Sequence, residues 1–455
     1  MNNDMNNNMN NSNNKRIAFH NLGCKVNAYE SELMQQNFIN NGYELVAFDE
    51  IADIYIINTC TVTNIADRKS RQMLHRAKAL NPEAVVVAVG CYAESNPEGA
   101  AEDEAIDLVV LNREKRDIVT ILGNYLKERE GIECFMDTEY TLNTLSEHTR
   151  AYIKIQDGCN QFCSYCIIPY SRGRITSRDK EETLKEIRQL VKKGCREFVL
   201  TGIHLSSYGL DINNESGLQR NYNDVAKEGS YTNIALISLM EEIGRIPGVE
   251  RIRLGSLEPR IITDELLLRC RKLKQFCPHF HLSLQSGSDT VLKRMNRRYD
   301  TKEYKEKVEL IRKYFEHPAI TTDVIVGFPG ETIQEFEETR KYLEAIDFYE
   351  VHIFKYSRRR GTVADKMPGQ LTDKEKGERS RLLSEDSKRR ALNYRRYYLN
   401  KEVEVLMEEA LDGEYYVGYN KEYVRFAYKS TEDVAGKIIT GIAREMKDEE
   451  IIIMS

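Results

Sequence analysis

Three closely spaced cysteines stand near the middle of the chain. Cys159, Cys163 and Cys166 lie in the run DGCNQFCSYC at residues 157–166, which gives the pattern C-x-x-x-C-x-x-C. Three thiolates on one short loop can hold three irons of a cubane iron–sulfur cluster and leave the fourth iron open for catalysis. Zinc is the alternative metal, but structural zinc sites usually show two C-x-x-C pairs or a set of Cys and His ligands, and no fourth ligand follows here at such a spacing. The spacing therefore favours an iron–sulfur cluster with one open iron.

Three other cysteines are far apart in the sequence but occupy matching positions. Cys24, Cys60 and Cys91 each lie just past the carboxyl end of a predicted strand, namely the first, third and fourth of the amino-terminal region. In a flavodoxin-like order 2-1-3-4-5 these strands are neighbours, so their thiols converge at the sheet edge where such domains bind ligands. One such cysteine alone is more often a small buried apolar residue. Three at matching positions favour a second cluster with one open iron.

The elements that position the second set of cysteines follow from the alternation of short apolar runs with helical stretches. The predicted strands are 16–20, 43–48, 54–58, 84–89 and 107–111, and the predicted helices lie near 27–40, 65–80 and 113–127. This alternation predicts an α/β domain over residues 15–145, with a flavodoxin-like parallel sheet that holds the second cluster.

A second series of strands and helices follows over residues 146–371. The predicted strands are 152–155, 198–201, 251–255, 281–284, 322–326 and 352–354. Six βα units indicate a partial (β/α)6 barrel that is open on one side. The polar stretch 211–231 has no apolar period, so we interpret it as a surface insertion.

The two ends of the chain differ from these regions. Residues 1–14 are an Asn-rich tract that cannot bury a core and is expected to be disordered. Residues 372–397 are typical of a charged, basic helical connector. From residue 398 to 455 short alternating strands and turn residues predict a small all-β barrel.

The bulk composition bounds the class of protein. At 455 residues, with 41% hydrophobic and 30% charged residues, the chain is typical of a soluble protein of two or three domains. No apolar run approaches the ~20 residues of a membrane span, and the amino terminus does not have the pattern of a signal peptide. We therefore expect a cytoplasmic protein with no membrane association. In that compartment ten cysteines are more often metal ligands than disulfides.

A basic patch is the one feature of the charge distribution that favours nucleic acid. The net charge of -6 does not indicate a nucleic-acid-binding protein, but residues 351–400 contain fourteen Lys and Arg against six Asp and Glu. The candidate RNA-binding residues are Arg358, Arg359, Arg360, Arg389 and Arg390. Most charge runs are solvated faces. The run 358–360, however, follows the last predicted barrel strand, and this position favours contact with RNA.

The motifs around the six cysteines resemble those of a known family. The run at 157–166 resembles the signature of the radical S-adenosylmethionine (SAM) enzymes. The runs NLGCKVNAYESE (21–32), INTCTVT (57–63) and VGCYA (89–93) resemble the amino-terminal motifs of the methylthiotransferases, which are radical SAM enzymes with a second [4Fe-4S] cluster. GYNKEYVRF (418–426) is similar to the RNA-binding TRAM barrel. Within this family, the residues at 22–27 and 58–63 most resemble the motifs of the branch that acts on N6-threonylcarbamoyladenosine at tRNA position 37.

The resemblance implies the cofactors, the partners and the reaction. The cofactors would be two [4Fe-4S] clusters and SAM, and the partners a tRNA anticodon stem-loop and an electron donor such as flavodoxin or ferredoxin. The cluster at Cys159, Cys163 and Cys166 would cleave SAM to a 5′-deoxyadenosyl radical, which removes the hydrogen from carbon 2 of the adenine. The cluster at the other three cysteines would supply a sulfur that a second SAM methylates. No catalytic residue is assigned beyond the cluster ligands.

Seven further residues resemble family positions that line the SAM site. They are Thr201, Gly202, Ser256, Glu258, Gln285, Val324 and Gly327. Each follows or overlaps a predicted barrel strand, where catalytic groups of such barrels lie. Each also fits an ordinary βα turn. His204 is interpreted as a polar lining residue, and Cys134, Cys195, Cys270 and Cys277 as structural.

Other functions remain open at the level of sequence. The substrate could be isopentenyladenosine at position 37 or ribosomal protein S12, because barrel and clusters would be shared. A non-catalytic iron–sulfur RNA-binding protein is the alternative of another class. The terminal barrel is acidic, with seven Lys and Arg against thirteen Asp and Glu over 398–455, so the basic connector is the better candidate for phosphate contacts. An Arg near the carboxyl end of a barrel strand is the expected partner of the threonylcarbamoyl carboxylate.

Overall fold

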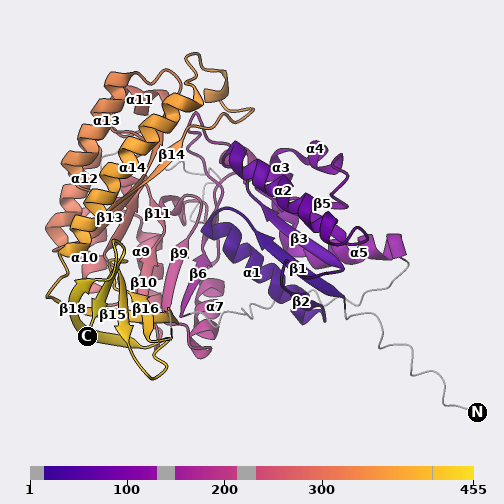
Figure 1. The fold of residues 1–455 in the computed structure, drawn as a ribbon, viewed down its shortest axis with the longest axis horizontal. Coiled ribbons are helices and arrows are strands. Elements are labelled where there is room, and N and C mark those ends of the chain that lie inside the picture. The colour runs from indigo at the N-terminus through magenta and orange to yellow at the C-terminus, as the bar shows by residue number, and fades with distance from the viewer. Residues whose placement is uncertain (1–14, 131–148, 213–231, 412) are drawn as a thin grey trace, which may run out of the picture. The chain divides into compact units, whose positions relative to one another are not determined.

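A computed structural model describes residues 15–130, 149–212, 232–411 and 413–455. The chain forms two compact units (Figure 1), and the C-x-x-x-C-x-x-C motif at 157–166 is divided between them. The first unit comprises Met1–Leu145 with Cys166–Gly173, and the second Ser146–Tyr165 with Arg174–Ser455. The Asn-rich residues 1–14, Cys134 and most of the stretch 211–231 lie outside the described residues. Within the described part, no helix is long and apolar enough to cross a membrane.

The first unit is built on a five-stranded parallel sheet in the order β2-β1-β3-β4-β5, which confirms the flavodoxin-like topology. Its strands are β1 Arg16–Asn21, β2 Glu44–Val46, β3 Ile54–Thr59, β4 Val85–Gly90 and β5 Leu108–Val110. The central strands β3 and β4 are buried along their whole length. Continuous apolar runs are typical of parallel strands that are covered on both faces.

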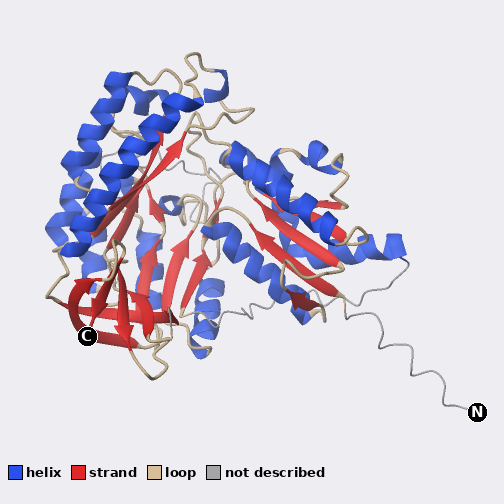
Figure 2. Ribbon diagram, in the orientation of Figure 1, coloured by secondary structure: helices blue, strands red, loops and turns tan. Residues whose placement is uncertain are grey.

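Helices cover both faces of this sheet (Figure 2). They are α1 Lys25–Asn40, α2 Asn64–Leu80, α3 Cys91–Ser95, α4 Pro97–Ala101, η1 Asn112–Asp117, α5 Ile118–Glu130 and α6 Ile168–Ser171. Alternate residues of one strand pack into different cores: Ile54 and Ile56 contact the residues of α1 and α5, while Tyr55 and Ile57 contact those of α2 and α3. The carboxyl edge of the sheet therefore stays available for the loops that carry cysteines.

The second unit contains the expected partial barrel. Its parallel strands form the sheets β10-β9-β6 and β11-β12-β13-β14. They are β6 Arg150–Lys154, β9 Glu197–Thr201, β10 Arg251–Leu254, β11 Ser256–Leu257, β12 His279–Leu282, β13 Ala319–Val326 and β14 Glu350–Lys355, and a short antiparallel pair joins β7 Gln156–Asp157 to β8 Thr176–Ser177. Strand β12 begins two residues before the predicted 281–284. It ends at Leu282, and Gln285, three residues later, takes a positive φ of 73° and pairs with Val324 in an isolated bridge.

Helices pack on the outer face of the barrel strands. They are α7 Lys180–Lys192, η2 Leu205–Ser207, α9 Ile234–Gly244, η3 Pro259–Ile261, α10 Asp264–Lys272, α11 Asp289–Arg294, α12 Thr301–Tyr314, α13 Ile333–Ile346, η4 Ala364–Lys366 and α14 Asp373–Arg396. Phe280 and Leu282 of β12 and Ile320 and Val324 of β13 point into the core shared with these helices. Because side chains alternate along a strand, His281 and Asp323 point to the opposite, inner face.

Helix α14, the predicted connector, packs along β14 and β13 (Figure 1). It begins with a capping box between Thr372 and Glu375. Arg395 binds Glu350 at 2.7 Å, and Arg379 donates to the buried Glu331 at 2.5 Å. Several cations of this basic segment therefore hold the helix on the barrel.

The carboxy-terminal strands close into a small barrel in the order β15-β16-β17-β19-β18, as predicted. They are β15 Glu402–Ala410, β16 Tyr415–Tyr419, β17 Arg425–Lys429, β18 Ile438–Met446 and β19 Ile451–Met454. This barrel packs against the amino-terminal ends of the larger barrel's strands. Arg251 donates to the Tyr419 carbonyl at 2.6 Å, and Arg253 to the Lys421 carbonyl at 3.0 Å.

A buried carboxylate neutralises the arginines at this junction. Glu197 accepts hydrogen bonds from Arg150 at 2.8 Å and from Arg253 at 2.9 Å. Burial opposes its ionisation, but the guanidinium groups of Arg253 and Arg150 lower the pKa of Glu197 to about 2. The amino-terminal end of the larger barrel is thus filled by an ion-pair network, and its carboxyl end is the one left for a site.

Candidate metal centres and their surroundings

The dispersed cysteines lie at the carboxyl ends of three neighbouring strands of the first unit. Cys24 is the N-cap residue of α1, Cys60 directly follows β3, and Cys91 is the first residue of α3. Burial is the main cause that raises the pKa of the Cys60 thiol to about 11, and the thiols of Cys91 and Cys24 contribute to this rise. The three cysteines therefore lie at one edge of the sheet and influence one another electrostatically. Three thiols on neighbouring loops of one sheet edge, which lose their protons when metal binds, are a donor set of the kind that an iron–sulfur cluster requires.

Two glycines let the backbone approach these cysteines. Gly90 has a φ of 103°, and a Cβ there would lie 2.5 Å from the Thr59 carbonyl oxygen. Gly23 has a φ of 107°, and a Cβ there would lie 2.9 Å from Cβ of Cys60. Both positions therefore exclude other residues for reasons of conformation and of space. Each precedes a cysteine, so the pair sets the separation between the three cysteine loops.

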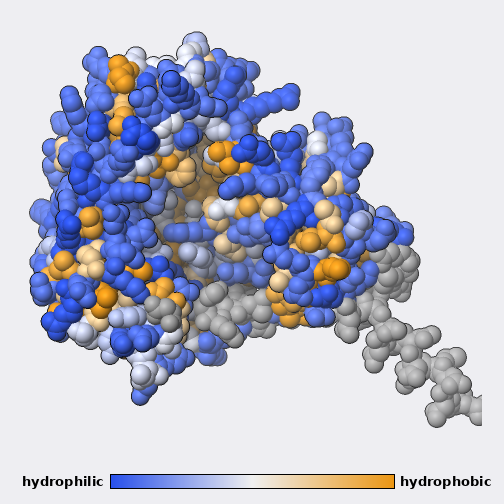
Figure 3. All heavy atoms as spheres, viewed as in Figure 1, coloured by the Kyte–Doolittle hydropathy of each residue, from blue (hydrophilic) through white to orange (hydrophobic). Residues whose placement is uncertain are grey.

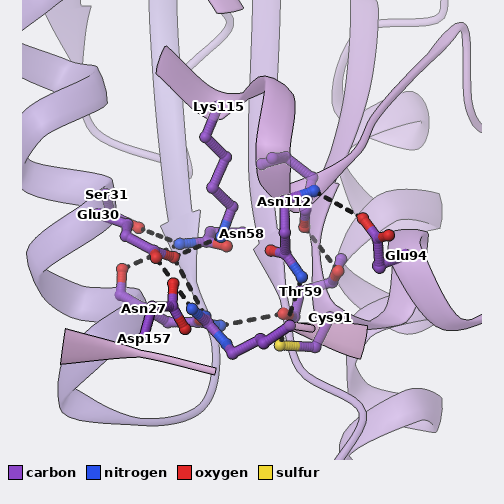
Figure 4. A network of polar contacts seen from close by, with 12 residues as sticks. Asn27, Glu30, Ser31, Asn58, Thr59, Cys91, Glu94, Asn112, Lys115 and Asp157 are labelled. Atoms are coloured by element: carbon purple, nitrogen blue, oxygen red, sulfur yellow. Dashed lines mark hydrogen bonds and ion pairs between the residues drawn. The ribbon is translucent and has the colours of Figure 1, made fainter. Parts of the chain in front are cut away.

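Amide and hydroxyl side chains tie the same loops together (Figure 4). Nδ2 of Asn27 donates to the carbonyls of Leu22 at 2.7 Å and Thr59 at 3.0 Å. Nδ2 of Asn58 donates to the Asn27 carbonyl and to Oγ of Ser31, both at 2.9 Å. These bonds connect the loops after β1 and β3, so the polar residues of the NLGCKVN and INTCTVT motifs position the thiols.

A buried charge cluster lies beside the same thiols. Nζ of Lys115 binds Oε2 of Glu30 at 2.5 Å (Figure 4), and Arg172 binds Oε1 of Glu30 at 3.0 Å. Burial lowers the pKa of Lys115, against the opposing charge of Glu30. Arg172 also donates to Oδ1 of Asn27 at 2.6 Å, and Nδ2 of Asn112 lies 4.0 Å from the Cys91 sulfur. Two cations and one carboxylate leave a net positive charge, which favours thiolates.

The sequence offered little sign of this cluster. Lys115 lies in the charged stretch NREKRD at 112–117. Arg172 lies in the run SRGR at 171–174, which follows the cysteine motif at 157–166. Lys115 and Glu30 are 85 positions apart, and Arg172 and Glu30 are 142 apart. Only the folded chain brings them together.

The cysteine loop of the second unit is organised by Gln156, which sequence reasoning also missed. Its Nε2 donates to the carbonyls of Asp157 at 2.6 Å and Gly158 at 2.8 Å, immediately before Cys159. Its Oε1 accepts the His204 backbone N–H at 2.6 Å. A Cβ at Gly202 would lie 2.9 Å from Oε1 of Gln156. Glycine at 202 therefore makes room for this glutamine.

The other side of the loop rests on the segment after α11. Arg297 donates to the Cys163 sulfur at 3.2 Å, and Nδ2 of Asn296 donates to the Phe162 carbonyl at 2.9 Å. Burial raises the pKa of the Cys159 thiol to about 12, while the Arg297 charge opposes the rise. The loop thus presents sulfurs beside a buried cation. Cys166 follows three residues later, where the chain passes into the first unit.

The residues predicted to bind SAM all lie in the second unit, at or past the carboxyl ends of its strands. Thr201 ends β9 and is buried, while Ser256 begins β11 and is exposed. Glu258 is buried and accepts the Arg260 backbone N–H at 3.0 Å. The sequence-based assignment of these groups to SAM stays a prediction.

The remaining predicted SAM residues follow β12 or belong to β13 and its loop. The backbone N–H of Gln285 donates to the Asp323 carbonyl at 2.8 Å. The Val324 side chain is fully buried in the helix-side core, so only its backbone is available to a cofactor. Gly327 follows β13, and its N–H donates to the Glu331 carboxylate at 2.6 Å.

His204 has the character of a neutral polar lining residue. Its Nδ1 lies 2.6 Å from Oγ of Ser207, and its Nε2 lies 3.3 Å from Nε2 of Gln161. Burial lowers the pKa of His204 to about 3, and the nearby Arg297 charge lowers it further. It is therefore uncharged at neutral pH.

The five candidate RNA-binding arginines differ in exposure. Arg358 and Arg360 are exposed, and Arg358 is paired with Asp365 at 3.0 Å. Arg359 is buried. Arg389 is exposed and pairs with Asp386 at 3.2 Å, whereas Arg390 is buried. Only the exposed members present their guanidinium groups to a partner.

The other described cysteines are buried in the second unit. Burial raises the pKa values of Cys195 and Cys270 to about 12 and that of Cys277 to about 11. Protonated thiols in an apolar core are poor nucleophiles and poor ligands. Their environment agrees with a structural role.

The visible face of the molecule is mostly hydrophilic, with hydrophobic side chains in small groups (Figure 3). Such a surface does not distinguish one function from another.

Comparison with known proteins gives a consistent result. Residues 153–343 match the Radical SAM superfamily, and residues 16–111 match the Uncharacterized protein family UPF0004. The chain is 40% identical over 435 residues to Threonylcarbamoyladenosine tRNA methylthiotransferase MtaB of Bacillus subtilis (strain 168), covering 93% of this chain and 92% of that protein. It is 39% identical over 416 residues to the protein of the same name from Aquifex aeolicus (strain VF5), covering 90% and 97%.

Two other matches are more distant. The chain is 34% identical over 407 residues to tRNA-2-methylthio-N(6)-dimethylallyladenosine synthase of Thermoanaerobacter sp. (strain X514), covering 87% of this chain and 83% of that protein. The fold is similar to that of the radical S-adenosylmethionine methyltransferase TsrM from Kitasatospora setae, solved with cobalamin and a [4Fe-4S] cluster bound. That match has a TM-score of 0.54 at 15% identity and covers 77% of each chain, so it supports the fold alone.

Proposed function

The chain belongs to the radical SAM methylthiotransferase family, and we propose that it adds a methylthio group to carbon 2 of N6-threonylcarbamoyladenosine at position 37 of tRNA. The observation that carries this proposal is the identity of 40% over 93% of the chain to a protein named for that substrate. The amino-acid sequences of the motifs at 22–27 and 58–63 support the same branch of the family.

Enzymes of this family use SAM and [4Fe-4S] clusters, and the two three-thiol sets of this chain fit that requirement. When bound, these groups supply the radical that removes the carbon 2 hydrogen and the sulfur and methyl group that replace it. We propose Cys159, Cys163 and Cys166 as ligands of one cluster, and Cys24, Cys60 and Cys91 as ligands of the other.

The protein's own residues hold these groups in place. Gln156 fixes the backbone that precedes Cys159, and the positively charged guanidinium of Arg297 donates a hydrogen bond to the Cys163 sulfur. Lys115 and Arg172 place positive charge beside the other thiols. Outer residues of this kind orient metal ligands and tune the metal.

The proposed substrate suits a site at the carboxyl end of the barrel. Position 37 lies in the unpaired anticodon loop, so its base can be splayed out at modest cost. We propose that the exposed Arg358, Arg360 and Arg389 contact the phosphates of the anticodon stem-loop. The electron donor is proposed to be a flavodoxin or ferredoxin, and the compartment the cytoplasm.

A direct test compares two tRNAs. The anaerobically reconstituted enzyme is supplied with SAM, a reductant and tRNA that carries either threonylcarbamoyl or isopentenyl on adenosine 37. Nucleosides are then analysed by mass spectrometry. We expect the threonylcarbamoyl tRNA to be converted at least ~10²-fold more efficiently, because a site built for polar groups rejects an apolar analogue.

The control is the Cys24→Ala variant, which should make no methylthio product from either tRNA. Equal conversion of the two tRNAs by the unaltered enzyme would overturn the branch assignment. Activity on ribosomal protein S12 alone would overturn the assignment of tRNA as substrate.

A further inference from the structure

We propose that His281, Asp323 and His352 form a binding site for a divalent transition-metal ion in the wall of the barrel. The three residues come from the adjacent strands β12, β13 and β14, and Asp323 is paired in register with His352. One ligand atom from each lies within 4.8 Å of the others. Among the described residues, no other group of His, Cys, Asp and Glu has this geometry.

The His281 ring is held as a metal-binding imidazole usually is. Its Nδ1 hydrogen-bonds with Oγ1 of Thr321 at 2.9 Å, and its Nε2 lies 3.1 Å from Oδ2 of Asp323. An outer partner on one ring nitrogen fixes the orientation of the other toward a metal. The rings of His281 and His352 are stacked, with centroids 5.6 Å apart and an angle of 29°.

The donor set selects the class of metal. Two imidazoles and one carboxylate suit zinc, ferrous iron and similar ions, whereas magnesium and calcium prefer oxygen ligands alone. Three protein ligands leave at least one position open, as in catalytic rather than structural sites. With a divalent ion the group carries a net charge of about +1, since only Asp323 contributes a negative charge.

A second histidine–aspartate pair shows why the third residue matters. His75 and Asp103 in the first unit are also 3.1 Å apart, and the His75 side chain is 59% exposed. Within the described residues, that pair is a surface contact with no third His, Cys, Asp or Glu beside it in such a group. His281 and His352 differ because Asp323 lies between them on the middle strand. The comparison also supplies a matched control.

The position of the site indicates what completes the metal's coordination. Asp323 precedes Val324, and its carbonyl accepts the N–H of Gln285, so the triad borders residues that we propose for SAM. The side chains of His281 and Asp323 are 13% and 26% exposed on the inner face, and His352 is exposed. We infer that an oxygen ligand of the substrate, the threonylcarbamoyl carboxylate, binds the open position. This clause rests on the proposed function; binding of the metal does not.

The test measures zinc in the holoenzyme, with both clusters in place so that their thiols are occupied. The anaerobic protein is incubated with Zn²⁺, passed through a desalting column and analysed for zinc and iron in the same sample. We expect about one zinc per chain in the unaltered protein, with the iron content unchanged. His352→Ala and Asp323→Asn should each lose that zinc, and His75→Ala should keep it.

His352→Ala is informative because an exposed side chain can be removed without a cavity. Thr321→Val adds a graded change: loss of the outer partner should weaken zinc binding ~10–100-fold while all three ligands remain. Equal zinc retention by the unaltered protein and the His352→Ala and Asp323→Asn variants would overturn the site, as would loss of the zinc in His75→Ala.

A second measurement separates this inference from the proposed function. The zinc-loaded enzyme and His352→Ala are compared on threonylcarbamoyl and isopentenyl tRNA. A rise in KM for the first tRNA alone, with kcat maintained, supports carboxylate binding by the metal. An unchanged KM would overturn that ligand assignment. If neither tRNA is a substrate, the proposed function fails while the zinc measurement still decides the metal site.

Discussion

The two cysteine sets of this chain are built in opposite ways. Cys159 and Cys163 share one loop, whose shape is fixed by Gln156 on one side and by the segment 294–297 on the other. Cys24, Cys60 and Cys91 come from three strands, and the register of a parallel sheet brings them together. The first site therefore combines cysteines that are neighbours in the sequence with supporting bonds from Gln156 and from the distant segment 294–297, whereas the second depends on the fold of a whole unit for the cysteines themselves.

Removal of either set should have the largest effect and should separate the two roles. The unaltered protein should bind about eight irons as two [4Fe-4S] clusters. The triple Ala variant at Cys159, Cys163 and Cys166 should keep about four irons and lose SAM cleavage entirely. The reciprocal variant at Cys24, Cys60 and Cys91 should keep SAM cleavage and make no methylthio product. Iron analysis and assay of 5′-deoxyadenosine check both, and cleavage by the first variant would contradict the assignment.

Gly90→Ala should damage only the dispersed site. The new Cβ would meet the Thr59 carbonyl at 2.5 Å on a backbone with a φ of 103°, so we expect a loss of ~3 kcal/mol or more in unfolding free energy. The iron of the second cluster should be lost with it. Gly173→Ala is the control, because its φ is 76° but nothing lies within 4 Å of the added Cβ. Denaturant unfolding with iron analysis checks the pair, and equal losses would refute the steric account.

Gln156→Ala should loosen only the loop site. The backbone carbonyls before Cys159 would lose their side-chain donor, so a chelator should remove iron from that cluster ~10–100-fold faster. Gln275→Ala is the matched control, because Gln275 also donates to a carbonyl, that of Gly244 at 2.9 Å, but is more than one hundred residues from Cys159, Cys163 and Cys166 in the sequence. The measurement is the rate of loss of cluster absorbance. Equal rates in the two variants would remove Gln156 from the site.

Arg297→Gln should lower the reduction potential of the loop cluster and leave the other cluster unchanged. Loss of one hydrogen bond from a charged donor, about 1.5 kcal/mol, corresponds to roughly 60 mV for a one-electron couple. Redox titration followed by electron paramagnetic resonance resolves the two clusters, so the second serves as an internal control. An equal shift of both would indicate a general structural effect.

The smallest effect is expected from the exposed arginines near the barrel. Arg358→Ala with Arg360→Ala should weaken tRNA binding and lower the slope of log Kd against log salt by about two. Arg76→Ala, an exposed arginine of the first unit paired with Asp49 at 2.6 Å, is the control. Titrations at several salt concentrations check this. If the slope of log Kd against log salt did not change, residues 358–360 would be part of a solvated surface that does not contact tRNA.

Much of the fold followed from the sequence because its signals are periodic. The strand order of the first unit and the six-unit partial barrel were both predicted from apolar runs and turn residues. The bounds of β12 differ from the prediction by two residues, His279–Leu282 against 281–284. The run His279–Leu282 alternates as well as 281–284 does, so periodicity alone could not choose.

The supporting residues of the sites were beyond sequence reasoning for another reason. Lys115, Glu30 and Arg172 are joined only by folding, and each alone resembles a surface charge. The burial of Arg359 and Arg390 was equally hidden, because a run of arginines does not show which members face the core. The triad of His281, Asp323 and His352 likewise depends on the pairing of three strands.

The proposed reaction is tested most directly in cells. Total tRNA is taken from a strain that lacks this gene, from the same strain with the unaltered gene restored, and from one with the Cys24→Ala variant, and its nucleosides are analysed by mass spectrometry. We expect the methylthio form of N6-threonylcarbamoyladenosine only in tRNA from the strain with the unaltered gene restored. The nucleoside without the methylthio group should accumulate in the other two strains. An unchanged level of that methylthio nucleoside in the deletion strain, or its restoration by the variant, would contradict the proposed reaction.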